Sequence, residues 1–137
     1  MKAVIVDTGA IVALLSKNDQ WRTRALDIFE TLDATLLTCE SAITECCFLL
    51  RNTHNGERIV LDLISSNALT IDFSISEHID NIAALMQKYR SVPMSLADAC
   101  LVRMSEVLDA PIFTFDRDFE VYRRHGRKRI PLIGIGD

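Results

Sequence analysis

The residues of this 137-residue sequence best suited to chemistry are four acids with apolar neighbours. Asp7 follows the apolar run "KAVIV" and Asp116 follows "PIFTF", whereas Glu45 and Asp98 lie within "SAITECCFLL" and "MSLADACLV". A buried carboxylate without a partner is costly, so such acids are usually paired with a cation or bound to a metal. Glu45 has no lysine or arginine within a helical turn, which favours a functional role.

The other acids also have a structural explanation. Asp7 could cap the helix that follows it, because Asp is a preferred N-cap residue. Ser95 and Asp98 match a capping box, in which the acid bonds back to the amide of the first residue. Asp116 could cap a short helix, and Asp118 is either a helix-start acid or a further metal ligand. Taken singly, these acids leave both roles open.

Short apolar stretches alternate with amphipathic ones along the chain. Residues 2–6 are apolar and largely β-branched, which is typical of a buried strand. Apolar residues at spacings of three and four indicate helices between such runs. The alternation predicts a single α/β domain over residues 1–137 with a mainly parallel sheet. The expected strands are 2–6, 34–38, 68–73, 111–115 and 130–135, and the expected helices are 8–16, 20–32, 41–51, 57–65, 76–90 and 95–108.

This order of elements predicts that the acids meet at one edge of the sheet. Asp7 and Asp116 end strands, while Glu45 and Asp98 lie near the starts of helices that should follow the edge where open α/β sheets bind ligands. Concentrated negative charge requires a cation, and oxygen ligands favour Mg²⁺ or Mn²⁺ over zinc. The three histidines are scattered on polar stretches and offer no competing cluster.

Three other classes of protein place an aspartate after a strand in this way. The Asp-Thr-Gly of residues 7–9 matches the aspartic protease signature, but those proteases are almost wholly β, and here helices follow. Phosphoryl-accepting receivers need a further acidic pair and a lysine after a late strand, which "PIFTFD" does not supply. The phosphatase signature needs an acid where Gly9 stands. The pattern therefore argues against all three.

Four segments, "VIVDTGAIVALL", "TCESAITECCFLL", "VPMSLADACLVRMSE" and "PIFTFDRDF", resemble in order and spacing the PIN domain, specifically the VapC-type toxin ribonucleases of toxin–antitoxin pairs. The resemblance implies a three-layer α/β/α fold. It implies an active site of Asp7, Glu45, Asp98 and Asp116, with Asp118 as the alternative fourth acid and the hydroxyls of Thr8 and Thr114 beside the first and last acids. Gly9 departs from the serine that many relatives carry.

The activity implied by this resemblance is endonucleolytic hydrolysis of RNA, with one or two Mg²⁺ or Mn²⁺ ions held by the carboxylates. The implied substrate is single-stranded or structured RNA of the tRNA or rRNA kind. The implied partners are a cognate antitoxin protein and a second copy in a homodimer. The alternative is a catalytically inactive RNA-binding or protein-interaction domain on the same fold, which would be expected to lose acids that this sequence keeps.

The charge distribution bears on these partners. A net charge of −4 argues against binding nucleic acid through the overall field. The segment "RRHGRKR" at 123–129 is either a solvated, disordered surface segment or a patch that contacts phosphates. The apolar runs are too short for a membrane helix, and Asp7 interrupts any signal-peptide core, so we expect a cytoplasmic protein that binds no membrane. The candidate RNA contacts are Arg51, Arg117, Arg123, Arg124 and Arg127.

Overall fold

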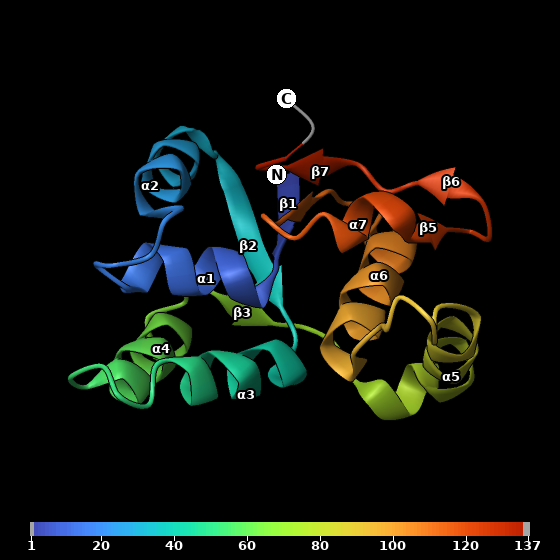
Figure 1. Ribbon diagram of the computed structural model, residues 1–137, viewed down its shortest axis with the longest axis horizontal. Helices are drawn as coiled ribbons and strands as arrows, with labels where there is room; N and C mark the ends of the chain where they lie inside the picture. Colours follow the sequence, from blue (N-terminus) through green and yellow to red (C-terminus); the bar gives the residue numbers. More distant parts are fainter. Residues whose placement is uncertain (1, 136–137) are drawn as a thin grey trace.

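The computed structural model describes residues 2–135, and its centre is a five-stranded parallel sheet (Figure 1). The strand order is β3-β2-β1-β4-β7, so the first strand along the chain is the middle one. Ile5 of β1 pairs with Leu37 of β2 on one side and with Ile112 of β4 on the other. The bounds are β1 Lys2–Val6, β2 Ala34–Thr38, β3 Thr70–Ile71, β4 Ile112–Phe113 and β7 Leu132–Ile133.

Helices cover both faces of the sheet, which confirms the three-layer α/β/α arrangement (Figure 1). One core joins the sheet to α1–α4 and contains Ile11 and Val60, and the other joins it to α5–α7 and contains Leu101 and Phe119. Residues 4–6 of β1 are all buried, because a central parallel strand is covered on both faces. No helix within residues 2–135 is long and apolar enough to cross a membrane. The bounds are α1 Thr8–Leu15, α2 Arg22–Thr31, α3 Glu40–Leu49, α4 Gly56–Ser65, η1 Ile75–His78, α5 Ile79–Lys88, α6 Leu96–Leu108 and α7 Asp118–Val121.

Three strands are shorter than the sequence predicts. The strand expected over 68–73 is reduced to β3, because Leu69 packs into the core under α1–α4 while Phe73 packs against the opposite core. The strands expected over 111–115 and 130–135 are reduced to β4 and β7, although the Thr114 amide still donates to the Ile133 carbonyl at 2.9 Å. The helix expected over 76–90 begins as the 3₁₀ turn η1.

The basic segment 123–129 forms a hairpin, which rules out the disordered alternative for this segment, whereas the patch that contacts phosphates stays a prediction. β5 Arg123–Arg124 and β6 Lys128–Arg129 pair antiparallel. His125 and Gly126 in the connecting turn have positive φ angles of 53° and 85°, and only glycine adopts such a φ without strain. The hairpin directly follows α7 in the chain.

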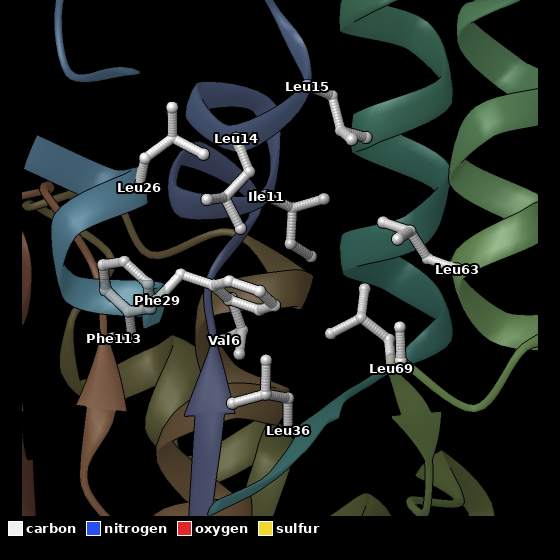
Figure 2. Close-up of a pocket in the computed structure, with 11 residues that line it drawn as sticks. Val6, Ile11, Leu14, Leu15, Leu26, Phe29, Leu36, Leu63, Leu69 and Phe113 are labelled. Carbon is white, nitrogen blue, oxygen red and sulfur yellow. The ribbon is translucent and has the colours of Figure 1, made fainter. Parts of the chain in front are cut away.

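An apolar pocket of about 210 Å³ lies between the sheet and the helices α1, α2 and α4 (Figure 2). Ile11 of α1, Phe29 of α2 and Leu63 of α4 face it from the helices, and Val6 and Phe113 face it from the sheet. No titratable side chain lines this pocket, so the chemistry of the acids belongs to another part of the molecule.

Candidate active site at the carboxyl edge of the sheet

Asp7 is the first residue after β1, and only 5% of its surface is exposed. Its Oδ1 accepts a hydrogen bond of 2.7 Å from the Thr8 amide, so the side chain caps α1. Its Oδ2 accepts one of 2.6 Å from the Thr114 hydroxyl, which follows β4. The cap and the cross-strand contact coexist because the helix begins where the strand ends.

Burial is the main reason that the pKa of Asp7 is raised from 3.8 to about 7. The hydrogen bonds from Thr114 and Thr8 lower this pKa, while the negative charges of Asp98 and Asp116 raise it. The structure thus brings three acids close enough to repel one another, although they are far apart along the chain.

Asp98 lies in the first turn of α6 and takes part in a complete capping box. The Asp98 amide donates to Ser95 Oγ at 3.0 Å, and the Ser95 amide donates to Asp98 Oδ2 at 3.2 Å. The Tyr122 hydroxyl donates to the same Oδ2 at 3.0 Å. Burial raises the pKa of Asp98, these hydrogen bonds lower it, and the charge of Asp116 raises it.

Tyr122 is a site residue that the sequence reasoning missed. Its ring is buried and packs edge to face on Phe119 at 5.2 Å between ring centroids. A buried tyrosine usually needs a partner for its hydroxyl, and here the partner is Asp98, 24 residues away. The spacing of Phe119 and Tyr122 could have indicated a buried ring, but nothing local indicates which acid it would reach.

Glu45 of α3 is half-buried and is held by Thr8, whose hydroxyl donates to Oε1 at 2.8 Å. Thr8 therefore links two acids, with its amide on Asp7 and its hydroxyl on Glu45. The apolar neighbours of Glu45 are not all buried, since Phe48 is 61% exposed and Leu49 is 55% exposed.

The sequence pattern predicts that Asp116 directly follows a strand. In the structure β4 already ends at Phe113, so this prediction is wrong. The Asp116 amide donates to Thr114 Oγ1 at 3.0 Å, and Asp116 Oδ1 accepts a bond of 2.9 Å from the Asp118 amide. The charge of Asp116 contributes to raising the pKa of Asp7, Asp98 and Asp118. Asp116, and not Asp118, is among the main causes of the raised pKa of both Asp7 and Asp98, so Asp116 is the more central of the two.

Two of the arginines considered as RNA contacts bind within the chain. Arg124 forms an ion pair of 2.6 Å with Asp109 and donates to the Ser105 carbonyl at 2.9 Å, which ties the hairpin to α6. Arg123 donates to the carbonyls of residues 120–122 at the end of α7. Both guanidinium groups therefore have structural partners.

The other three arginines lie closer to solvent. Arg51 donates to the Phe48 carbonyl and stacks over the Phe48 ring at 3.9 Å, beyond the end of α3. Arg117, next to Asp116, forms an exposed ion pair with a glutamate of α7 at 2.6 Å. Arg127 is exposed in the hairpin turn. These three have the exposure that contact with a phosphate requires.

The donor atoms of the acids suit a hard divalent cation. Within residues 2–135, Asp98 Oδ1 and Glu45 Oε2 accept no hydrogen bond, and no ion pair involves Asp7, Glu45, Asp98 or Asp116. Oxygen ligands of this kind fit Mg²⁺ or Mn²⁺. As arranged, no three His, Cys, Asp or Glu side chains of the described residues lie close enough together to hold one ion. The acids would therefore have to close around a cation, and the exposed Asp116 has the most room to move.

Comparison with solved structures shows the same fold in bacterial toxins. VapC20 of Mycobacterium tuberculosis, a toxin that cleaves the sarcin-ricin loop, is similar with a TM-score of 0.79 at 17% identity, over 86% of this chain and 93% of VapC20. A toxin–antitoxin complex from Klebsiella pneumoniae gives 0.65 at 18% identity, over 83% and 87%. VapBC2 of Rickettsia felis, bound to a DNA fragment from its promoter, gives 0.64 at 14% identity, over 96% and 97%.

The family is established by the sequence itself. No curated protein matches the chain. The model of the PIN domain, however, matches residues 4–125, which include all four acids and the hydroxyls of Thr8 and Thr114. The alternatives with an aspartic protease, receiver or phosphatase fold are thereby excluded. The chain belongs to the PIN domain family.

Proposed function

We propose that this protein is a Mg²⁺- or Mn²⁺-dependent endoribonuclease and the toxin of a toxin–antitoxin pair. The observation that carries the proposal is the convergence of Asp7, Asp98 and Asp116 at the carboxyl edge of the sheet with no lysine or arginine paired to them in the described chain. Membership of the PIN family and the likeness to VapC toxins support the same assignment.

Each residue of the site has a defined task in this proposal. Asp7, Asp98 and Asp116 hold the cation, and Glu45 binds it or orients the attacking water. A bound divalent cation would activate a water molecule and neutralise charge on the phosphate. Thr114 and Thr8 keep the Asp7 carboxylate oriented by donating to each of its oxygens. Tyr122 does the same for Asp98.

The proposed substrate is single-stranded or looped RNA. VapC20 cleaves the sarcin-ricin loop, which supports a looped substrate without identifying the RNA. The exposed Arg51, Arg117 and Arg127 are the proposed phosphate contacts. A cognate antitoxin and a homodimer complete the proposal, and the antitoxin is supported by the complex from Klebsiella pneumoniae.

The test compares the purified protein with the Asp98→Asn variant on tRNA, rRNA and single-stranded RNA. The asparagine keeps a side-chain oxygen for the Ser95 amide, so the cap of α6 survives while the charge is lost. We expect cleavage by the wild type in Mg²⁺ or Mn²⁺, none in chelator, and at least a hundredfold slower cleavage by Asp98→Asn, as is typical when a group that stabilises the transition state is removed. Asp27→Asn, on the exposed side of α2, is the matched control and should cleave normally. Equal cleavage by Asp98→Asn would contradict the proposal.

The alternative function, an RNA-binding or interaction domain without catalysis, is favoured by one observation. No three candidate ligands of the described residues lie close enough together to hold a single ion as they stand. This alternative predicts RNA binding that is insensitive to chelator, with no RNA cleaved in either metal. The same assay therefore separates the two functions.

A further inference from the structure

We propose that Trp21 and Phe115 form a stacking platform that binds one base of the RNA substrate beside the acidic site. The inference rests on the proposed function, because it names a contact for the same RNA. It concerns a base flanking the cleaved bond, since Trp21 belongs to the connection between α1 and α2 and contributes none of the acids.

The two rings are stacked face to face. Their centroids are 5.0 Å apart and their planes differ by 5°. Phe115 in turn packs edge to face on Phe113 at 5.6 Å, and Phe113 is fully buried. Trp21 remains 41% exposed. The three rings thus extend from the core to the surface and end in the indole, whose exposure leaves apolar area for another flat ring.

The backbone of Trp21 is fixed before any ligand arrives. The Asp19 carboxylate accepts a bond of 2.8 Å from the Trp21 amide, and the Trp21 carbonyl accepts one of 2.8 Å from Ala25 in α2. The next residue, Arg22, donates to the Leu14 carbonyl at the end of α1 at 3.0 Å. The Trp21 backbone is held by these bonds and its ring is already stacked on Phe115. The residue therefore loses little conformational freedom on binding, which favours affinity.

The platform adjoins the acidic site through Phe115. This residue lies between Thr114, whose hydroxyl binds Asp7, and Asp116. Consecutive Cα atoms are about 3.8 Å apart, so a base stacked on Trp21 would lie within reach of a nucleotide whose phosphate meets the acids.

The charges around Trp21 favour a nucleic acid over an apolar protein surface. Residues 17–24, "KNDQWRTR", hold three cations and one acid, in contrast to the net negative chain. Lys17 and Arg24 are exposed. Aromatic rings combined with cations are typical of single-stranded nucleic acid binding, where stacking holds the base and the cations hold the backbone.

Trp21 is the sole tryptophan of the chain, so its fluorescence reports the contact directly. The protein is titrated in chelator, which prevents cleavage, with a short single-stranded oligoribonucleotide of mixed sequence. We expect saturable quenching of the Trp21 emission. An abasic oligomer of the same length should quench far less, because it offers phosphates without a base to stack.

Variants test the contribution to affinity, measured by the anisotropy of labelled RNA. Trp21→Leu should weaken binding about 5- to 150-fold, the range expected for one base–aromatic contact, whereas Trp21→Phe should retain most of the affinity. Phe29→Leu makes a similar change at an exposed aromatic residue of the following helix α2 and should bind RNA as the wild type does. Melting temperatures confirm that each variant is folded.

Two results would overturn the platform: no quenching at RNA concentrations that saturate the anisotropy signal, or wild-type RNA affinity in Trp21→Leu. Weaker binding of an antitoxin by Trp21→Leu, with RNA affinity unchanged, would assign the surface to the protein partner and would also overturn it. Quenching and loss of affinity in a protein that cleaves no RNA would support the platform while refuting the nuclease function. The two proposals can therefore fail separately.

Discussion

The Asp7→Asn substitution should stabilise the metal-free protein at alkaline pH while it abolishes RNA cleavage. The pKa of Asp7 is about 7 in the folded protein and 3.8 is its ordinary value, so between these values the folded state holds a proton that the unfolded chain has lost. The free energy of unfolding contributed by Asp7 therefore falls as the pH rises through this window, and the loss is complete above pH 7 or so.

The pKa of Asp7 differs between 3.8 in the unfolded chain and about 7 in the folded protein. At 1.36 kcal/mol per pKa unit, holding the ionised carboxylate in the folded protein costs about 4 kcal/mol. The asparagine avoids this penalty, but it forgoes the Thr114 hydrogen bond to Oδ2, at a cost of about 1 kcal/mol. We therefore expect Asp7→Asn to be more stable than the wild type by about 2–3 kcal/mol at pH 8. For a domain of this size that difference raises the melting temperature by about 10 °C. Near pH 4 the advantage should vanish.

The assay is urea denaturation in chelator at several values between pH 4 and pH 8, followed by a repeat at pH 8 with Mn²⁺. Mn²⁺ should stabilise the wild type, since it binds the folded state, and should leave Asp7→Asn nearly unchanged. Asp27→Asn, an exposed acid on α2, is the control and should follow the wild type throughout. A stability difference between Asp7→Asn and the wild type that stays constant across this pH range, or a less stable variant at pH 8 in chelator, would refute the reasoning.

Three further substitutions probe the neighbours of Asp7. Tyr122→Phe removes the hydrogen bond to Asp98 Oδ2 while keeping the ring, so the pKa of Asp98 should rise and the affinity for Mn²⁺, measured by calorimetry, should fall about 10- to 100-fold. Asp116→Asn should reduce RNA cleavage more than Asp118→Asn in a comparison of kcat/KM, because the charge of Asp116 reaches more of the other acids; the reverse order would make Asp118 the fourth acid. Arg124→Ala should lower the free energy of unfolding by about 1–3 kcal/mol, since the carbonyl of the buried Ser105 loses its donor, and RNA affinity that also falls would identify Arg124 as a phosphate contact after all.

The sequence predicts the layers of this fold better than the lengths of its strands. The apolar run of β1 and the helical periods between strands are local patterns, and they led to the α/β domain with a mainly parallel sheet, while the three-layer arrangement followed from the family resemblance. The ends of β3 and β4 depend on where Leu69, Phe73 and Phe115 pack, which is a property of the tertiary structure. The hairpin of residues 123–129 was missed for the same reason, because its arginines bind carbonyl and carboxylate groups that local sequence does not reveal.

The same limit applies to the site. The acids could be found because a carboxylate in an apolar segment is unusual, and the order of elements placed them at one edge. The hydroxyls that orient these acids could not be found in the same way, because a threonine or tyrosine is common in a strand or a short helix and gives no local signal of a site. Thr114 was identified through family resemblance alone, and Tyr122, which reaches Asp98 from 24 residues away, was not identified at all.

The structural and functional explanations of Asp7 and Asp98 turn out not to compete. Each side chain caps a helix, and each lies among the repelling carboxylates. The two roles share one position because the carboxyl edge of a parallel sheet is also where the following helices begin, with unpaired amides that favour a negative group. A cap needs only an oxygen acceptor, which asparagine supplies, whereas a cation site needs the charge. Substitution by asparagine therefore separates the two roles: the cap survives at both positions, so the protein should stay folded, and a loss of metal affinity in the folded variant would indicate that the charge is retained for the cation.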